Sequence, residues 1–280
     1  MKSLSNTIYS RFREDGFVEI DGVLDPATVS TLRERFGLVF GEHYETGLLP
    51  DKVKWRRDIS PEGIPRTVCN AWKSDRTIAQ VVLSPHIGKI ASKLMGWPGA
   101  RVNQDTITWV PPGAGGVAFH QDNSYQDWHQ PDGIITCWIV LSETGKNGSN
   151  IEYAVGSHKW PLDQRVPQFL VPEEYKSELR KAAKRHDQVA NVTEVALLSG
   201  SAAFHHGKTW HGTGVNRSSC DRYSLSVHLM SSDSTFHSQN LSPMFNRYKL
   251  SGTLAMEETF FPITWTETGA KSNFIDSYVR

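Results

Sequence analysis

The sequence lacks long apolar runs and an excess of charge of either sign. Nowhere do about 18 consecutive apolar residues occur, so we expect no membrane-spanning helix. Residues 1–9 contain no long apolar run either, so we expect no secretory leader. Lys and Arg total 30, and Asp and Glu also total 30. This balance argues against nucleic acid or an anionic lipid surface as the main partner.

Cysteine is scarce. The 280 residues include three cysteines, Cys69, Cys137 and Cys220, and they are far apart. An odd, scattered set does not build a disulfide framework or a zinc knuckle, so we expect a reducing, cytoplasmic location. Internal repeats and low-complexity tracts are also absent. The nine tryptophans favour a large aromatic core over an aromatic-lined pocket.

Helical patterns dominate residues 1–100. The stretch 17–20 predicts a short strand, and Asp25 followed by Pro26 is typical of a helix start. Apolar residues then recur at helical spacing to about Phe40. Residues 41–66 are rich in Gly, Pro and charge, which predicts a long irregular connection. A second helix is expected from Ser84 to Gly96.

From Arg101 onward the pattern changes to short strands. We expect strands at 101–110, 134–141, 151–155, 195–198, 202–206 and 222–230, and one inserted helix at about 172–185. Helices and strands do not alternate as they do in βαβ units. This order predicts a mainly β fold, a jelly roll or cupin-like barrel over 101–265 with N-terminal helices packed on it. We expect a single domain over 1–280.

The triplet His120-Gln121-Asp122 is the first candidate for chemistry. On an extended strand, residues 120 and 122 face the same side, so an imidazole and a carboxylate point into one volume. With one distant histidine they form the two-histidine, one-carboxylate face that suits Fe(II). Such a face leaves three coordination positions open.

Three histidines downstream are candidates for the third ligand: His205, His206 and His211. Two of them are followed eleven residues later by an arginine, His206 by Arg217 and His211 by Arg222. Arg217 lies in a turn-like polar run, whereas Arg222 opens an alternating strand with one polar face. We therefore favour His211 with Arg222, and we interpret His205 and His206 as structural or supporting residues.

Several motifs occur together in an order and spacing that resembles the phytanoyl-CoA dioxygenase (PhyH) family. They are His120-Gln121-Asp122, Cys137-Trp138, Asn147-Gly148, Gly156-Ser157-His158-Lys159, His211-Gly212-Thr213-Gly214, Asn216-Arg217, Arg222 and Phe260-Phe261-Pro262-Ile263-Thr264-Trp265. The resemblance covers the chain from about Val18 to Trp265. It implies a double-stranded β-helix and oxygenation that depends on Fe(II), 2-oxoglutarate and O2.

The resemblance also implies roles for individual residues. His120, Asp122 and His211 would be the iron ligands, and Arg222 would bind the far carboxylate of 2-oxoglutarate. An arginine suits this task because its planar fork gives charge-assisted hydrogen bonds of about 1.5–3 kcal/mol each. The further co-substrate contacts that it implies are Trp138, Thr213 and Gln104. Halogenases that resemble this family have a small residue in place of the carboxylate, so Asp122 favours hydroxylation.

We therefore expect an enzyme, an Fe(II)/2-oxoglutarate-dependent dioxygenase that hydroxylates an unactivated C–H bond of a small molecule and releases succinate and CO2. Two alternatives stay open: the same site desaturates, cyclises or epimerises its substrate, or the chain is a non-catalytic cupin-like binding protein. No basic cluster for the phosphates of coenzyme A stands out. A secondary metabolite, an amino-acid derivative or an organophosphonate is thus preferred to a long acyl chain. The sequence gives no oligomeric state.

Overall fold

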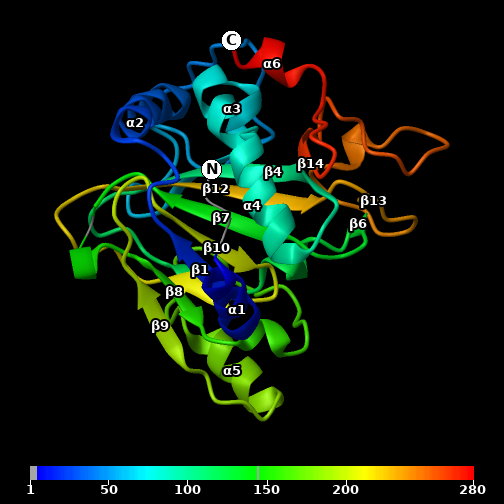
Figure 1. Ribbon diagram of the computed structural model, residues 1–280. Helices are drawn as coiled ribbons and strands as arrows, with labels where there is room; N and C mark the ends of the chain where they lie inside the picture. The colour runs from blue at the N-terminus through cyan, green and yellow to red at the C-terminus, as the bar shows by residue number, and fades with distance from the viewer. Residues whose placement is uncertain (1–4, 144) are drawn as a thin grey trace.

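The structure is a computed structural model that describes residues 5–143 and 145–280. Two antiparallel sheets form its centre, and helices cover the outer side of each (Figure 1). The larger sheet has the strand order β1-β10-β7-β12-β4-β3-β2, and β14 also pairs with β4. Its strands are β1 (Phe17–Ile20), β2 (Lys52–Val53), β3 (Arg66–Cys69), β4 (Gly99–Val110), β7 (Ile135–Val140), β10 (Ala202–His206), β12 (Arg222–Ser231) and β14 (Ile263–Thr266).

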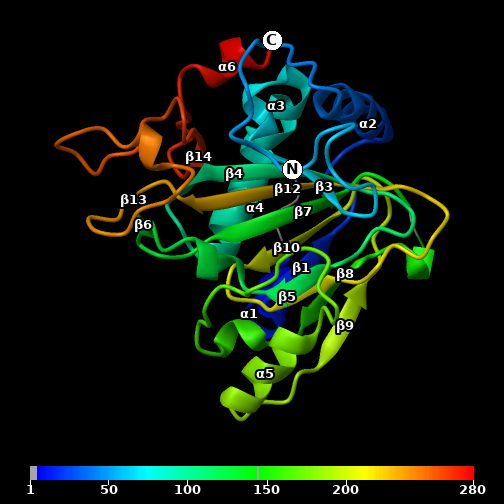
Figure 2. The same ribbon diagram turned by 180° about the vertical axis from the view of Figure 1, so that it is seen from behind.

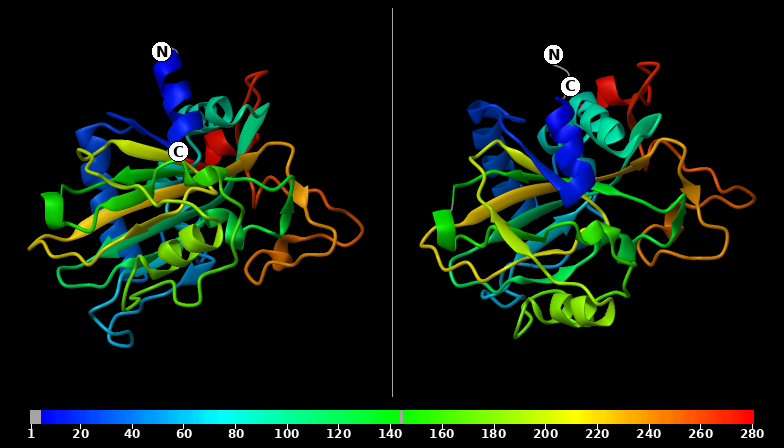
Figure 3. Two further views of the ribbon diagram at one scale, coloured as in Figure 1. Left: turned by 90° about the horizontal axis from the view of Figure 1, so that it is seen from below. Right: turned by 60° about the horizontal axis from the view of Figure 1, so that its bottom comes forward.

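The smaller sheet has the order β5-β11-β8-β9 and lies across from the larger one (Figure 2). Its strands are β5 (Val117–His120), β11 (His211–Thr213), β8 (Ile151–Ala154) and β9 (Val192–Val195). A separate pair, β6 (His129–Gln130) and β13 (Thr235–Phe236), lies at one side, where the chain after β13 projects (orange in Figure 3). The expected mainly β fold is confirmed.

The helices bury their apolar faces on these sheets. They are α1 (Asn6–Asp15), α2 (Pro26–Phe40), α3 (Arg76–Val82), α4 (Pro85–Met95), α5 (Ser177–Arg185) and α6 (Ile275–Tyr278), with short 3-10 turns η1 (Ala71–Lys73), η2 (Asp122–Tyr125), η3 (Gly145–Asn147), η4 (Ser157–Lys159) and η5 (Asn246–Tyr248). Asp25 caps α2 by accepting a 2.9 Å hydrogen bond from the backbone N–H of Thr28. None of the described helices has the length and apolar character needed to cross a membrane.

Apolar burial is divided between the two outer sides and the space between the sheets. The largest cluster joins helices α2, α3 and α4 to the outer face of the larger sheet, through residues such as Leu32, Ile78 and Ile107. A second cluster packs α5 on the smaller sheet through Leu179 and Phe119. A smaller cluster that includes Trp138 and Tyr153 fills part of the space between the sheets, and buried polar residues share that space.

Several predicted boundaries need correction. The strand expected at 17–20 is confirmed as β1, but the N-terminal hundred residues also give β2 and β3 to the larger sheet, and α1 and α3 were not expected. All four residues of β3 are buried, so the strand has no alternating pattern to reveal it. The strand expected at 195–198 lies earlier, as β9, and the inserted helix begins at Ser177. The single-domain assignment stays a prediction.

Candidate metal centre

Two neighbouring strands bring the predicted ligands together. His120 ends β5 and lies directly opposite His211, the first residue of β11. Asp122 was expected on the same strand, but it is the first residue of η2. Gln121 between them is still extended, with φ −111° and ψ 126°, so residues 120 and 122 face the same side. The three side chains are buried, and their ligand atoms lie within 4.8 Å of one another.

The two histidines present the same nitrogen to the shared volume. Their Nε2 atoms lie 3.2 Å (His120) and 3.7 Å (His211) from Oδ1 of Asp122. Each Nδ1 lies against a backbone carbonyl, that of Ala118 at 2.8 Å and that of Thr209 at 2.9 Å. A carbonyl oxygen can only accept, so Nδ1 carries the proton and Nε2 keeps its lone pair for a metal.

Burial and neighbouring charge set the protonation states. Burial, together with nearby His120 and His205, holds the pKa of His211 well below its ordinary value, so the ring is neutral. Burial by itself would raise the pKa of Asp122, but the surrounding histidines outweigh it and lower that pKa well below 3.8. Neutral imidazoles and an ionised carboxylate are the forms that bind a divalent metal ion.

Four further side chains fix the other oxygen of Asp122. The hydroxyl of Thr136 donates to Oδ2 at 2.7 Å, and Nε2 of His205 lies 3.2 Å from it. The Thr136 hydroxyl also lies 2.9 Å from Nδ1 of His228, and Tyr153 OH lies 2.8 Å from Nδ1 of His205. His205 thus takes the predicted supporting place. Thr136 was missed, although it is the one polar side chain in a strand that is otherwise apolar from residue 135 to 140.

Arg222 lies between the sheets without a charged partner. The residue is 3% exposed, its Nε has no hydrogen-bond partner in the described structure, and Nη1 donates to Ser224 Oγ at 3.3 Å. No carboxylate among the described residues lies within ion-pair distance of it. Burial lowers the pKa of Arg222 to about 10, so it stays charged at neutral pH. A buried cation of this kind calls for an anion.

The other predicted co-substrate contacts lie on the same inner faces. Trp138 is buried, and the centre of its ring is 5.7 Å from the guanidinium carbon of Arg222. Gln104 is half-buried and lies opposite His228 across β4 and β12. Thr213 is buried on the face of β11 that carries His211, and its hydroxyl accepts a hydrogen bond from the N–H of Val117.

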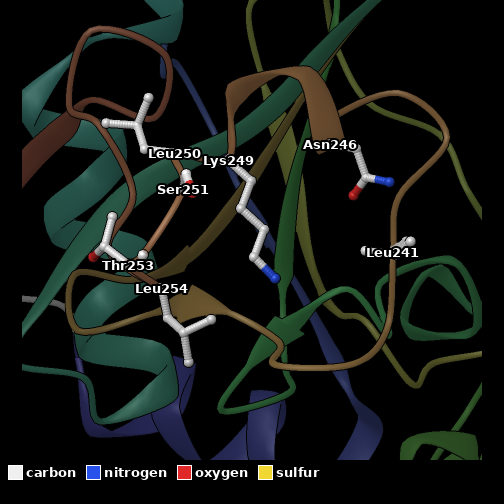
Figure 4. Close-up of a pocket in the computed structure, with 8 residues that line it drawn as sticks. Leu241, Asn246, Lys249, Leu250, Ser251, Thr253 and Leu254 are labelled. Atoms are coloured by element: carbon white, nitrogen blue, oxygen red, sulfur yellow. The ribbon is translucent and has the colours of Figure 1, made fainter.

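A separate hollow of about 600 Å³ lies in the segment after β13 (Figure 4). Loop residues 241–254 line it, and the side chain of Lys249 extends across it and donates to the carbonyl of His237 at 3.1 Å. None of the predicted site residues lines this hollow. The candidate metal centre is therefore distinct from this hollow.

Comparison with known proteins gives one family and several related structures. The family model described as "Phytanoyl-CoA dioxygenase (PhyH)" matches residues 12–224. A "Probable alpha-ketoglutarate-dependent hypophosphite dioxygenase" of Stutzerimonas stutzeri is 30% identical over 139 residues, an alignment that covers 48% of this chain and 46% of the relative. This chain thus spans under half the length of that relative.

Two solved structures from nogalamycin biosynthesis share the fold. The non-heme alpha ketoglutarate dependent carbocyclase SnoK is 24% identical with a TM-score of 0.72, and the match covers 93% of this chain and 96% of SnoK. The epimerase SnoN, in complex with Fe3+, alpha ketoglutarate and nogalamycin RO, is 22% identical with a TM-score of 0.69, covering 92% and 97%. Since the family model spans well over half of the sequence, the chain belongs to the phytanoyl-CoA dioxygenase (PhyH) family of iron- and 2-oxoglutarate-dependent dioxygenases.

Proposed function

We propose that this enzyme hydroxylates an unactivated C–H bond of a small molecule and converts 2-oxoglutarate to succinate and CO2. One observation carries the proposal: a buried face of two imidazoles and one carboxylate shares the space between the sheets with an unpaired arginine. The facing antiparallel sheets and the likeness to SnoK support the double-stranded β-helix that such sites use.

The residues fit an iron ion and 2-oxoglutarate. His120, Asp122 and His211 would hold the metal, and the orphaned guanidinium of Arg222 would bind the far carboxylate of the co-substrate. When bound, iron and 2-oxoglutarate supply the oxidative chemistry with O2.

The protein itself would orient the metal ligands and the co-substrate, and it would keep water out of the site. Thr136 and His205 hold Oδ2 of Asp122, which leaves Oδ1 to face the two Nε2 atoms. Trp138 covers the space beside Arg222 with an apolar ring, so an ion pair formed there would be shielded from solvent. Gln104 and Thr213 would complete the walls around the co-substrate.

A second outcome uses the same residues. SnoK is described as a carbocyclase and SnoN as an epimerase, so this architecture also serves reactions that add no oxygen to the product. The mass of the product separates the outcomes. Hydroxylation adds one oxygen atom, desaturation or ring closure removes two hydrogens, and epimerisation leaves the mass unchanged.

The test is a screen for succinate release with Fe(II), ascorbate and 2-oxoglutarate across classes of small anionic and neutral metabolites. We expect a true substrate to stimulate succinate formation, and Asp122→Ala to abolish it while the variant remains folded by circular dichroism. Substrate-stimulated turnover that survives in Asp122→Ala would remove the proposed function.

A further inference from the structure

A second unpaired cation, Lys54, faces the same interior. Its backbone N–H donates to the carbonyl of Thr67 at 3.0 Å, which continues the pairing of β2 with β3 by one residue. Thr67 lies opposite Thr108, and Thr108 lies opposite Ser224. Directly paired residues share one face of a sheet, so Lys54 lies on the face that carries Arg222.

An aromatic ring links Lys54 to the metal centre. Nζ of Lys54 lies 5.0 Å from the centre of the Phe169 ring. That ring meets the ring of His120 edge-on with 4.6 Å between centres, and it also contacts Tyr125 at 5.7 Å. The ammonium group is therefore separated from a metal ligand by a single phenyl ring, a distance that one small molecule can span.

No carboxylate of the described residues neutralises this ammonium group. Lys54 is half-buried, and no carboxylate in residues 5–143 or 145–280 lies within ion-pair distance of it. Burial is the main cause that lowers the pKa of Lys54; nearby Cys69 raises it and Lys52 lowers it, and the net direction is down. Keeping a partly desolvated cation unpaired costs stability, which indicates a role in binding an anion.

We propose that Lys54 binds an anionic group, a carboxylate or a phosphonate, on the primary substrate, while Phe169 and Tyr125 pack against its apolar part. The inference rests on the proposed function and adds a substrate class to it. The positions of the two cations distinguish the co-substrate site from the substrate site. Arg222 lies beside Trp138 in the buried interior, whereas Lys54 lies on the Phe169 side of His120, at the β2 edge of the sheet.

The test is a binding measurement in two steps on the whole chain. First, isothermal titration with Mn(II) and N-oxalylglycine, a redox-inert pair, establishes the metal and co-substrate sites. If N-oxalylglycine does not bind, the proposed function fails, whatever Lys54 does. Second, the protein loaded with both is titrated with benzoate and with phenylphosphonate, so that the two arms separate a carboxylate from a phosphonate.

We expect at least one of these probes to bind the loaded protein. Lys54→Met should weaken that binding about tenfold or more, and Lys54→Arg should retain most of it. The affinity for N-oxalylglycine should stay unchanged in both variants. Lys89→Met is the matched control, because Lys89 is an exposed lysine on α4, against the opposite face of the sheet, and its loss should change neither affinity.

Three results would overturn the assignment. They are binding of neither probe to the loaded wild-type protein, equal binding by wild type and Lys54→Met, and a loss of N-oxalylglycine affinity in Lys54→Met. The last result would place Lys54 in the co-substrate site instead.

Discussion

The two oxygens of Asp122 have different surroundings. Oδ1 faces the imidazoles of His120 and His211, and Oδ2 accepts from Thr136 at 2.7 Å. Partners of this kind fix the direction in which a carboxylate presents its free lone pairs. We therefore expect the affinity for metal to depend also on residues that do not contact the ion.

Thr136→Val tests this dependence. The substitution keeps the shape of the side chain but removes the hydroxyl between Asp122 and His228, so we expect the affinity for Mn(II) to fall about 10- to 100-fold. Isothermal titration with Mn(II) measures the change. Thr136→Ser should restore most of the affinity; if Val and Ser behave alike, the hydroxyl does not position the carboxylate.

Arg222 gives a second prediction for a single residue. Arg222→Lys keeps the charge but loses the planar fork, and Arg222→Gln loses both, so affinity for 2-oxoglutarate should fall in the order Arg, Lys, Gln. Loss of one charge-assisted hydrogen bond of about 1.5–3 kcal/mol corresponds to a KM for 2-oxoglutarate that is roughly 10- to 150-fold higher. Arg217→Gln, which alters an exposed arginine, should leave KM unchanged. An effect at 217 and none at 222 would reverse the assignment.

For single residues, the sequence predicted the features that are local or regularly spaced. His120 and Asp122 are two residues apart, and the alternation after Arg222 distinguishes it from Arg217. The contacts of Thr136 with Asp122 and His228 could not be predicted, because they depend on how β7 is placed beside β12 and against η2. A residue's polarity says that it needs a partner, but not which partner it finds.

The candidate metal centre depends on the close spacing of strands β5 and β11, which carry His120 and His211. Gly212 lies between His211 and Thr213 on β11, an inner strand of the smaller sheet. A Cβ atom added there would lie 2.9 Å from the backbone N of Phe119 and 2.9 Å from the carbonyl oxygen of Val117. Backbone atoms cannot move aside as flexible side chains do, so the two strands would have to separate.

We therefore expect Gly212→Ala to weaken Mn(II) binding more than tenfold by moving His211 away from His120, and to lower the melting temperature. The control is Gly37→Ala, at an exposed position of α2 with nothing near its added Cβ. It should leave metal binding unchanged and stabilise the protein by about 0.5–1 kcal/mol. Normal metal affinity in Gly212→Ala would contradict the strand-spacing argument.

Among the elements, those with local end signals were the most predictable. Helices α2 and α4 both begin where the sequence predicts, at an N-cap residue followed by proline: Asp25-Pro26 and Ser84-Pro85. Strand β11 was not predicted as a strand, because its three residues are too few to show a period. It is formed by pairing with β5 and β8, which is tertiary information.

For the whole molecule, buried histidines make stability depend on pH. Burial lowers the pKa of His129 and of His206 to about 4, whereas an unfolded histidine titrates near 6.5. Between these values the unfolded chain binds more protons, so stability is lost as pH falls from about 6.5 to 4. Asp105 opposes this: burial raises its pKa to about 7, so its folded form keeps a proton that the unfolded form has lost.

Urea denaturation of the metal-free protein at pH 4.5, 5.5 and 6.5 measures the slope of unfolding free energy against pH. His129→Gln should lower this slope by up to about 1.4 kcal/mol per pH unit, and Asp105→Asn should raise it by a similar amount. Slopes that match the wild type in both variants would show that these groups titrate alike in the folded and unfolded chain.

We infer that His120, Asp122 and His211 hold one metal ion. The most direct measurement is the stoichiometry and affinity of Mn(II) binding by isothermal titration of the wild type, Asp122→Ala, His211→Ala and His206→Ala. We predict one ion per chain in the wild type and in His206→Ala, and at least 100-fold weaker binding in the other two variants. Unchanged binding in Asp122→Ala or His211→Ala, or loss of binding in His206→Ala, would show that these three residues do not form the metal site.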